Sequence, residues 1–348
     1  MLFSLFVLGS VLLILVRTVN NKLNNPGDTS LEPDDTEPQP KEDVNIPVTE
    51  PLDKPSEPKQ PAVQPEAAPI STEEKPRTAE KPLWETKAKG EAPVRPNSSY
   101  GHLFGLIGKP LAHSASKVRF NKMFREQHID AHYENFELDS IEQVKDLVEN
   151  NPNLCGFNVT IPYKQDIIPY LNRLDETAKA IGAVNTVKVL HRDGGVELVG
   201  YNTDWIGFCK SFGELIEGHH KALILGTGGV SKAVKYALDS LGIENKFVSR
   251  NSTFDIMGYY ELSPSIMDEY DVIVNCTPMG MWPETGQCPD IPYTFLSENH
   301  LLLDVIANPE ETLFMKKGRE HGATAKGGKD MLEQQAVAAW EIWNRIGE

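Results

Sequence analysis

The sequence has few cysteines and a deficit of positive charge. Its four cysteines among 348 residues form no C-x-x-C pair and have no histidine nearby at zinc-ligand spacing, which argues against a disulfide framework or a metal site. Reduced thiols facing the cytosol are expected. Asp and Glu outnumber Lys and Arg by 50 to 34, for a formal net charge of -16. No basic run with interleaved aromatic residues overcomes this charge, so nucleic acid is not an expected partner.

Long hydrophobic runs are also absent, except at the start of the chain. The apolar stretch 2–16 (LFSLFVLGSVLLILV) precedes Arg17 and Lys22. A helix of this length spans roughly 22 to 24 Å, short of the roughly 30 Å hydrocarbon core, so a thinned bilayer or a few flanking residues would be needed to complete the span. Because no cation precedes the run and cations follow it, residues 1–24 are predicted to anchor a cytoplasmic protein to the inner membrane. A cleaved signal peptide and a wrongly assigned start codon are the alternatives.

Branched apolar and aromatic residues are nearly absent from residues 25–98. There, Pro alternates with Glu, Asp, Lys, Gln and Ala, as in EPDDTEPQPKEDV. Such a segment cannot bury enough surface to fold, and Pro-rich charged linkers are extended and semi-rigid. It is therefore predicted to be a disordered spacer, with a docking site for a partner as the alternative. About 250 residues remain to build cores.

From residue 103 onward, strand-like and helix-like segments alternate, as in an α/β layer architecture. The predicted strands are 103–108, 132–136 and 156–161, and the predicted helices are 140–149 and 165–174. The loop after the first strand carries His113, Ser114 and Ser116, and the two serine hydroxyls could point at one polar ligand. Ser116 could equally be the N-cap of the next helix.

Uncharged hydrogen-bonding side chains gather after the next strands. Asn158, Thr160 and Lys164 lie near a strand that a proline ends, and ligand-binding groups collect at such ends in open α/β sheets. The segments 182–186 (GAVNT) and 200–204 (GYNTD) add amides, hydroxyls and one carboxylate. A polyhydroxylated ligand needs this mixture, although each cluster alone is also typical of turns and caps.

The second half contains a strand, a glycine-rich turn, a helix and a strand in succession. The predicted strand 221–225 runs into Gly226-Thr227-Gly228-Gly229-Val230-Ser231, followed by a helix at 232–241 and a strand at 246–248. This order is that of a dinucleotide-binding βαβ unit, in which the glycines let a pyrophosphate approach the helix N-terminus.

The residues after the second of these strands indicate which dinucleotide. An NAD enzyme usually places Asp or Glu there to accept the ribose hydroxyl, whereas this chain has Ser249-Arg250-Asn251. Because arginine suits a 2′-phosphate, NADP is favoured over NAD. A solvated surface arginine is the alternative.

Two further buried strands, 271–275 and 301–305, end in loops on the same edge as the glycine turn. The last helix, 331–343, places an apolar stripe on one side, formed by Leu332, Ala336, Ala339, Trp340 and Trp343. Gln335 borders this stripe.

Together these motifs resemble the shikimate dehydrogenases from about residue 100 to residue 347. The resemblance rests on GLIGKPLAHSAS, NVTIPYK, IGAVNT, GYNTD, GTGGVS, SRN, NCTPMG, DVIANP and GGKDMLEQQA, which occur in the family's order and at its spacing. It implies an α/β fold of two domains with a cleft between them. Residues 99–204, completed by 323–348, would form a substrate-binding domain with a mixed sheet, and residues 205–322 a Rossmann-like NADP domain.

The resemblance also implies an activity and a set of site residues. The activity is the NADP-dependent interconversion of 3-dehydroshikimate and shikimate in aromatic amino acid biosynthesis, carried out by a monomer or homodimer. Lys164 and Asp204 would flank the reacting oxygen. The substrate would contact Ser114, Ser116, Thr160, Asn185, Asp204 and Gln335. The cofactor would contact Gly226, Thr227, Gly228, Gly229, Val230, Ser249, Arg250, Asn251, Thr277, Met279 and Gly328.

The chain departs from the family pattern at a few positions. Ala307 stands in place of a tyrosine expected beside the substrate, Lys329 and Asp330 replace small or apolar residues, and Asn251 replaces Thr or Ser. A dehydrogenase for quinate or another ring acid, or one with a different cofactor preference, is therefore an alternative. A non-catalytic scaffold that retains the fold is the other alternative, and the intact Lys164 and Asp204 weigh against it.

Overall fold

The structure of the chain is a computed structural model that describes residues 101–112 and 114–345. The predicted anchor and linker, and His113, lie outside the described residues. No helix in the described ranges is both long and apolar enough to cross a bilayer.

The first half of the described chain forms a six-stranded mixed sheet. Its elements are β1 (His102–Gly108), α2 (Ser116–Glu126), β2 (Ala131–Glu137), the 3-10 turn η2 (Ile141–Gln143), α3 (Val144–Glu149), β3 (Leu154–Val159), η3 (Ile168–Tyr170), β4 (Arg173–Leu174), α4 (Glu176–Ile181), β5 (Thr186–Arg192) and β6 (Gly195–Tyr201). The strand order is β2-β1-β3-β5-β6-β4. The first three strands are parallel, and β5 runs antiparallel to both β3 and β6.

The second half forms a six-stranded sheet whose strands all run parallel. Its elements are α5 (Asp204–Ile216), β7 (Lys221–Leu225), α6 (Gly229–Ser240), β8 (Glu244–Ser249), β9 (Ile256–Gly258), η4 (Tyr259–Glu261), α7 (Pro264–Glu269), β10 (Val272–Asn275), η5 (Tyr293–Phe295), β11 (Leu301–Asp304), α8 (Leu313–Glu320), β12 (Thr324–Lys326) and α9 (Lys329–Trp343). The order is β12-β11-β10-β7-β8-β9. This is the doubly wound order of dinucleotide-binding folds: the chain adds β8 and β9 on one side of β7, and then β10, β11 and β12 on the other.

Helices cover both faces of the second sheet, because its strands are apolar on both sides. On one face, side chains of α5 and α6 pack against Ile224 and Val274, and Met331 from α9 joins this cluster. On the other face, Phe314 of α8 and Met267 of α7 pack against the sheet. The predicted α/β class is therefore confirmed, with one mixed sheet and one parallel sheet.

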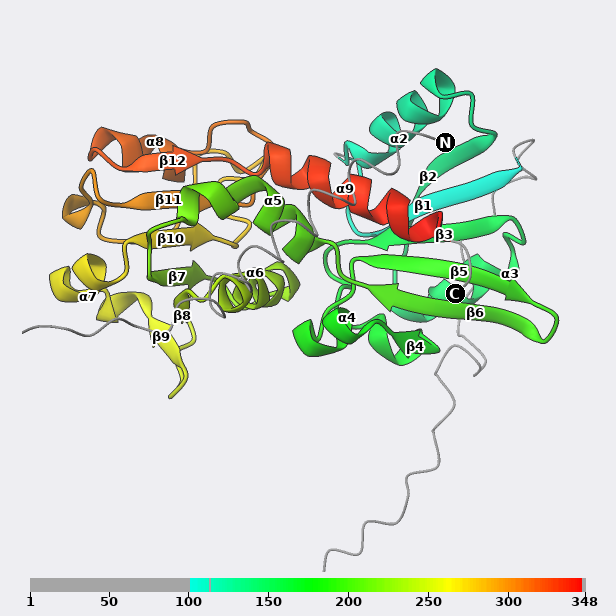
Figure 1. The fold of residues 1–348 in the computed structure, drawn as a ribbon, viewed down its shortest axis with the longest axis horizontal. Helices are drawn as coiled ribbons and strands as arrows, with labels where there is room; N and C mark the ends of the chain where they lie inside the picture. Colours follow the sequence, from blue (N-terminus) through cyan, green and yellow to red (C-terminus); the bar gives the residue numbers. More distant parts are fainter. Residues whose placement is uncertain (1–100, 113, 346–348) are drawn as a thin grey trace, which may run out of the picture. The chain divides into compact units, whose positions relative to one another are not determined.

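Helix α9 packs against both sheets. Met331, near its start, lies in the core of the second sheet, whereas Trp343, at its end, packs with Phe104 and Phe120 on the first sheet. Figure 1 shows α9, in red, running from the sheet of β10–β12 toward the sheet of β1–β6. Through α9, the end of the chain contributes to both halves.

Two predictions about local structure were wrong. Residues 165–174 do not form one helix: Pro169 lies in the short turn η3, and Arg173 and Leu174 then pair with β6. Proline lacks the N–H that a longer helix would need, so the pairing with the sheet prevails. The second sheet also extends past residue 322, the predicted end of its domain, because β12 pairs with β11.

The four cysteines are unpaired and half-buried. Burial raises the pKa of the Cys209 thiol to about 11 and raises that of Cys276 further. These thiols therefore remain protonated near neutral pH and act as small apolar side chains. Within the described ranges, no group of three or more His, Cys, Asp or Glu residues could hold a metal ion.

Candidate active site

A buried ion pair joins Lys164 and Asp204. Lys164 lies in the turn after β3, and Asp204 is the first residue of α5. Their Nζ and Oδ2 atoms are 2.6 Å apart, and their side chains are only 12% and 2% exposed. The helix N-terminus favours the carboxylate, and the carboxylate in turn compensates the lysine charge. The structure thus brings together the two residues predicted to be catalytic.

Asn185 connects this pair to the last helix. Its side-chain amide lies within hydrogen-bond distance of Asp204 Oδ1 (2.8 Å), Thr203 Oγ1 (3.0 Å) and Gln335 Oε1 (3.2 Å). Its Oδ1 accepts the backbone N–H of Thr203 at 2.7 Å. Asn185, directly before β5, therefore connects Asp204 at the start of α5 with Gln335 of α9.

Backbone hydrogen bonds hold these segments in register. The N–H of Val159 donates to the carbonyl of Asn185 at 2.9 Å, and the N–H of Val184 donates to the carbonyl of Lys164 at 2.7 Å. The Asn202 side chain donates to the carbonyl of Ala183 and accepts the N–H of Asp204. Hydrogen bonds to the backbone of the segments 182–186 and 200–204 therefore fix the positions of Lys164, Asn185 and Asp204.

Tyr133 belongs to the same polar network, which the sequence did not indicate. The hydroxyl of Tyr133 donates to Asn158 Oδ1 at 2.8 Å, and the Ser116 side chain lies near this hydroxyl. Burial holds the pKa of Tyr133 well above its usual range, so its hydroxyl stays protonated. Asn158 Nδ2 then donates to Thr186 Oγ1 at 3.0 Å, beside Asn185. Buried residues do not alternate regularly along β2, so periodicity alone could not have identified Tyr133 or its partner.

The alternative role of Ser116, as the N-cap of the next helix, was wrong. Helix α2 begins at Ser116, its N-cap is Ala115, and no side chain caps it. Ser114 Oγ accepts the N–H of Ser116 at 3.3 Å, and the Ser116 side chain lies near the Tyr133 hydroxyl.

Side chains of β2 bind the backbone of the loop after β1, which carries Ser114. Glu137 accepts the backbone N–H of Leu111, and Asn135 Nδ2 donates to the Leu111 carbonyl at 3.2 Å. Thr160 lies at the end of β3, and its N–H donates to the carbonyl of Ile107. No hydrogen bond within the described ranges joins Thr160 to the Lys164–Asp204 pair.

The glycine turn lies at the switch point of the second sheet, directly against the lysine. Gly226 has a φ of +102°, which favours glycine, and its N–H donates to the carbonyl of Val248 at 2.8 Å. Gly228 is the N-cap of α6, and no side chain caps the free N–H groups that follow at Gly229 and Val230. A Cβ added at Gly229 would lie only 3.0 Å from the Cβ of Lys164. An anion at this helix N-terminus would thus be bound beside the ion pair.

The remaining predicted cofactor residues lie along the same edge of the sheet. Arg250 is exposed after β8 and forms no ion pair or hydrogen bond with any described residue, while Ser249 Oγ accepts the N–H of Asn251 at 3.3 Å. Exposed Thr227 lies within the glycine turn. The methyl group of Thr277, after β10, would lie 3.2 Å from a Cβ added at Gly226.

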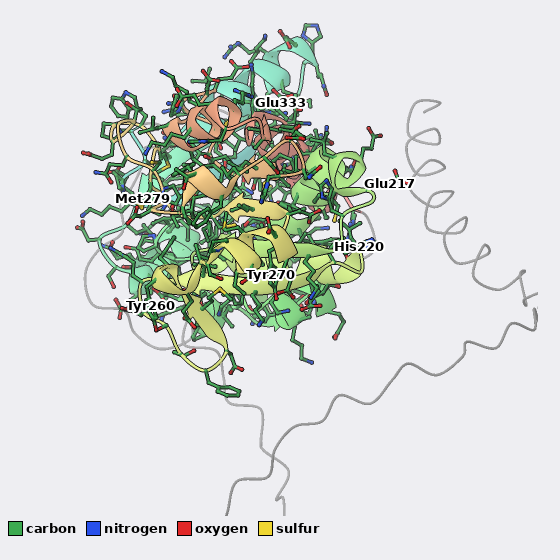
Figure 2. The ribbon with its side chains drawn as sticks, turned by 90° about the vertical axis from the view of Figure 1, so that its left-hand side faces the viewer. Glu217, His220, Tyr260, Tyr270, Met279 and Glu333 are labelled. Carbon is green, nitrogen blue, oxygen red and sulfur yellow. The ribbon has the colours of Figure 1, made fainter. Side chains whose placement is uncertain are left out.

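Met279 and Gly328 follow β10 and β12, respectively, at the carboxyl ends of these strands. Met279 lies on the side of the second sheet opposite Glu217 and His220 (Figure 2). Gly328 is the N-cap of α9, and its N–H donates to the Ile306 carbonyl at 2.9 Å. A Cβ at Gly328 would lie 2.3 Å from the Val305 carbonyl oxygen, so only glycine fits there.

The parallel sheet, the glycine turn and the adjoining buried Lys–Asp pair define a dehydrogenase of the dinucleotide-binding class with a second α/β lobe. A shikimate dehydrogenase (NADP(+)) of Methanococcus vannielii is 36% identical over 263 residues, which are 69% of this chain and 90% of the relative. The chain belongs to the shikimate dehydrogenase family.

Further comparisons agree with this assignment. The family model of the shikimate dehydrogenase substrate binding domain matches residues 106–187. A crystal structure of shikimate dehydrogenase from Aquifex aeolicus is 37% identical, with a TM-score of 0.62, covering 72% of this chain and 94% of that one. A quinate dehydrogenase from Corynebacterium glutamicum, in complex with NAD, is 27% identical with a TM-score of 0.61, covering 70% and 94%.

Proposed function

We propose that the chain is an NADP-dependent dehydrogenase that interconverts 3-dehydroshikimate and shikimate in aromatic amino acid biosynthesis. The observation that carries this proposal is the buried Lys164–Asp204 pair in contact with Gly229 of the glycine turn. In this arrangement a cationic lysine lies next to the loop that would hold the cofactor. Hydride transfer to a ketone requires these two parts to be adjacent.

The residues at the edge of the second sheet fit NADP. The uncapped N-terminus of α6 suits the pyrophosphate, and the unneutralised Arg250 suits a 2′-phosphate. When bound, NADPH supplies a hydride to the ketone carbon of the substrate. Ser249, Asn251, Thr277, Met279 and Gly328 would complete the binding surface for the cofactor.

In the reducing direction, Lys164 would act on the substrate oxygen. Negative charge develops on that oxygen as the carbonyl carbon is reduced, and the lysine Nζ stabilises this charge and donates a proton to it. Asp204 holds the lysine in place through the 2.6 Å contact. In the oxidising direction, the neutral lysine takes the hydroxyl proton.

The first sheet supplies groups for a polyhydroxylated acid. We assign Ser114 and Ser116 to the substrate carboxylate, and Thr160, Asn185 and Gln335 to the ring hydroxyls. The network from Tyr133 through Asn158 to Asn185, with Ser116 beside Tyr133, supports one continuous polar surface. On this proposal, residues 99–204 with the last helix bind the substrate, and the residues from 205 to about 326 bind NADP.

The proposal is tested by following the absorbance of reduced nicotinamide with the purified full-length chain. Shikimate and quinate are each offered with NADP and with NAD. We expect turnover with shikimate and NADP, and a loss of about 10²- to 10⁴-fold in kcat for Lys164→Ala. Lys179→Ala changes an exposed lysine of α4 and serves as the control. A Lys164→Ala variant that binds shikimate and keeps normal turnover would contradict the assigned role.

A quinate-type activity is the second candidate. It is favoured by the half-buried Ala307, whose small side chain leaves the ring substituents less constrained, and by the likeness to a quinate dehydrogenase. A higher kcat/KM for quinate than for shikimate would select it. A folded chain that binds NADP but oxidises neither acid would favour a scaffold instead.

We further propose that residues 1–24 tether the enzyme to the inner membrane, with the catalytic part in the cytoplasm as a monomer or homodimer. The apolar run and the cations that follow it support this. Membrane fractionation of the full-length chain tests it: recovery in the soluble fraction, with the N-terminal residues still present, would contradict the tether.

A further inference from the structure

A buried carboxylate lies at the carboxyl ends of the strands of the second sheet, next to the loops proposed to bind the cofactor. Asp304 is the last residue of β11 and is completely buried. It accepts hydrogen bonds from Thr312 Oγ1 at 2.6 Å and from the N–H of Ile306 at 3.0 Å, and both of its oxygens lie 3.2 Å from Asn275 Nδ2. The mechanism proposed above makes no use of it.

Asn275 extends this arrangement to the neighbouring loop. Asn275 ends β10 and lies opposite Asp304 in the sheet register. Its Oδ1 accepts both the N–H and the hydroxyl of Thr277, at 3.0 Å and 2.7 Å. Thr277 Oγ1 then accepts the N–H of Met279 at 3.3 Å. The conformation of residues 275–279 therefore depends on a side chain whose own amide group is held by Asp304.

The loops connected through Asp304 are the ones assigned to the cofactor. Thr277 borders Gly226 of the glycine turn. Ile306, whose N–H binds the carboxylate, uses its carbonyl to accept the N–H of Gly328. One carboxylate thus connects the loop after β10, the loop after β11 and the start of α9.

We propose that Asp304 is a positioning residue that sets the geometry of Thr277, Met279 and Gly328 for binding NADP. The proposal rests on the function proposed above. A carboxylate suits this place because it offers acceptors to all three donors and has no hydrogen to donate. A side chain without acceptors would leave the buried N–H of Ile306 unpaired and the Asn275 amide with only its 3.4 Å contact to the Met279 carbonyl, so their loops would rearrange.

The test compares Asp304→Ala with Asp304→Asn. Both substitutions remove the charge, but the asparagine oxygen can still accept from Ile306 and Asn275. Calorimetric titration with NADP, without substrate, should show dissociation weakened about tenfold or more for Asp304→Ala and less for Asp304→Asn. Steady-state rates should show a higher KM for NADP and a lower kcat, with the KM for shikimate unchanged.

Asp271→Asn is the matched control. Asp271 precedes β10 at the other edge of the same sheet, where it pairs with His219. Tyr270, the residue before it, is well separated from Met279 (Figure 2). Asp271→Asn should leave the affinity for NADP unchanged. If Asp304→Ala does not fold, Thr312→Val replaces it. It removes the 2.6 Å donor to Asp304, together with the hydroxyl that caps α8 at the N–H of Met315, and should weaken NADP binding about threefold.

Two results would overturn the proposal. Unchanged NADP affinity in the Asp304 variants, with only a lower melting temperature, would leave Asp304 with a purely structural role. An equal loss of affinity in Asp271→Asn would assign the effect to general loosening of the sheet. A wild-type chain that binds no NADP would be a different result, because it would overturn the proposed function and the positioning role together.

Discussion

Arg250 is exposed at the end of β8, and no described carboxylate neutralises it. Replacing Arg250 with alanine should therefore raise the KM for NADP about tenfold or more, because charge-assisted hydrogen bonds to a phosphate contribute about 1.5–3 kcal/mol. The KM for NAD should change little, since NAD has no 2′-phosphate. Initial rates with the two cofactors measure this. Lys246→Ala, which removes another exposed cation of β8, is the control; an equal loss with NAD would contradict the phosphate contact.

At the same scale, burial gives Asp304 a pH-dependent effect on stability. Burial raises its pKa to about 6, although its hydrogen bonds with Thr312, Ile306 and Asn275 oppose the shift. The Asp304 carboxyl group therefore binds a proton more tightly in the folded chain than in the unfolded chain. The stability that protonated Asp304 contributes below pH 4 is lost as the pH rises through about 6.

The variant Asp304→Asn tests this pH dependence. The free energy of unfolding of the wild type, minus that of Asp304→Asn, should fall by on the order of 3 kcal/mol between pH 4 and pH 7. Urea denaturation at several pH values in this range measures it. A difference that is constant over the range would show that Asp304 does not titrate there.

At the scale of elements, the start of α6 packs against the lysine that follows β3. A Cβ at Gly229 would lie 3.0 Å from Lys164 Cβ and 3.5 Å from Ala183 Cβ. Gly229→Ala should therefore displace Lys164 as well as the glycine turn, lowering kcat and raising the KM for NADP, each about tenfold. Steady-state kinetics measure both parameters.

The matched control for this variant is Gly213→Ala. Gly213 lies within α5, where an added Cβ meets nothing within 4 Å. Alanine there should stabilise the helix by about 0.5–1 kcal/mol and leave both kinetic parameters unchanged. If Gly229→Ala raised only the KM for NADP, the glycine would serve the cofactor alone.

At the scale of the whole molecule, α9 connects the two sheets. The ring of Trp343 lies 4.8 Å from that of Phe104, and its Nε1 donates to the carbonyl of Val187 at 2.9 Å. Trp343→Ala should reduce the free energy of unfolding by about 3–5 kcal/mol, because it leaves a cavity and an unpaired carbonyl. Chemical denaturation measures the loss. Val337→Ala, on the exposed side of α9, should stay within about 0.5 kcal/mol of the wild type.

The sequence by itself determined the elements whose signals are local. The strands 103–108, 221–225 and 301–305 and the glycine turn at 226–229 were predicted because hydrophobic runs and glycine placement depend only on neighbouring residues. Local periodicity wrongly predicted a helix at 165–174, because Pro169 and the pairing of β4 with β6 outweighed it.

The tertiary structure decided which side chains meet. Asn185 and Gln335 are 150 positions apart in the chain, yet their side chains lie 3.2 Å apart. The contacts of Tyr133 with Asn158, and of Asp304 with Asn275, likewise join different strands. No periodicity encodes such pairs, because they depend on strand order and on the packing of α9. The sequence thus identified the chemical groups of the site, while only the folded chain determined their partners.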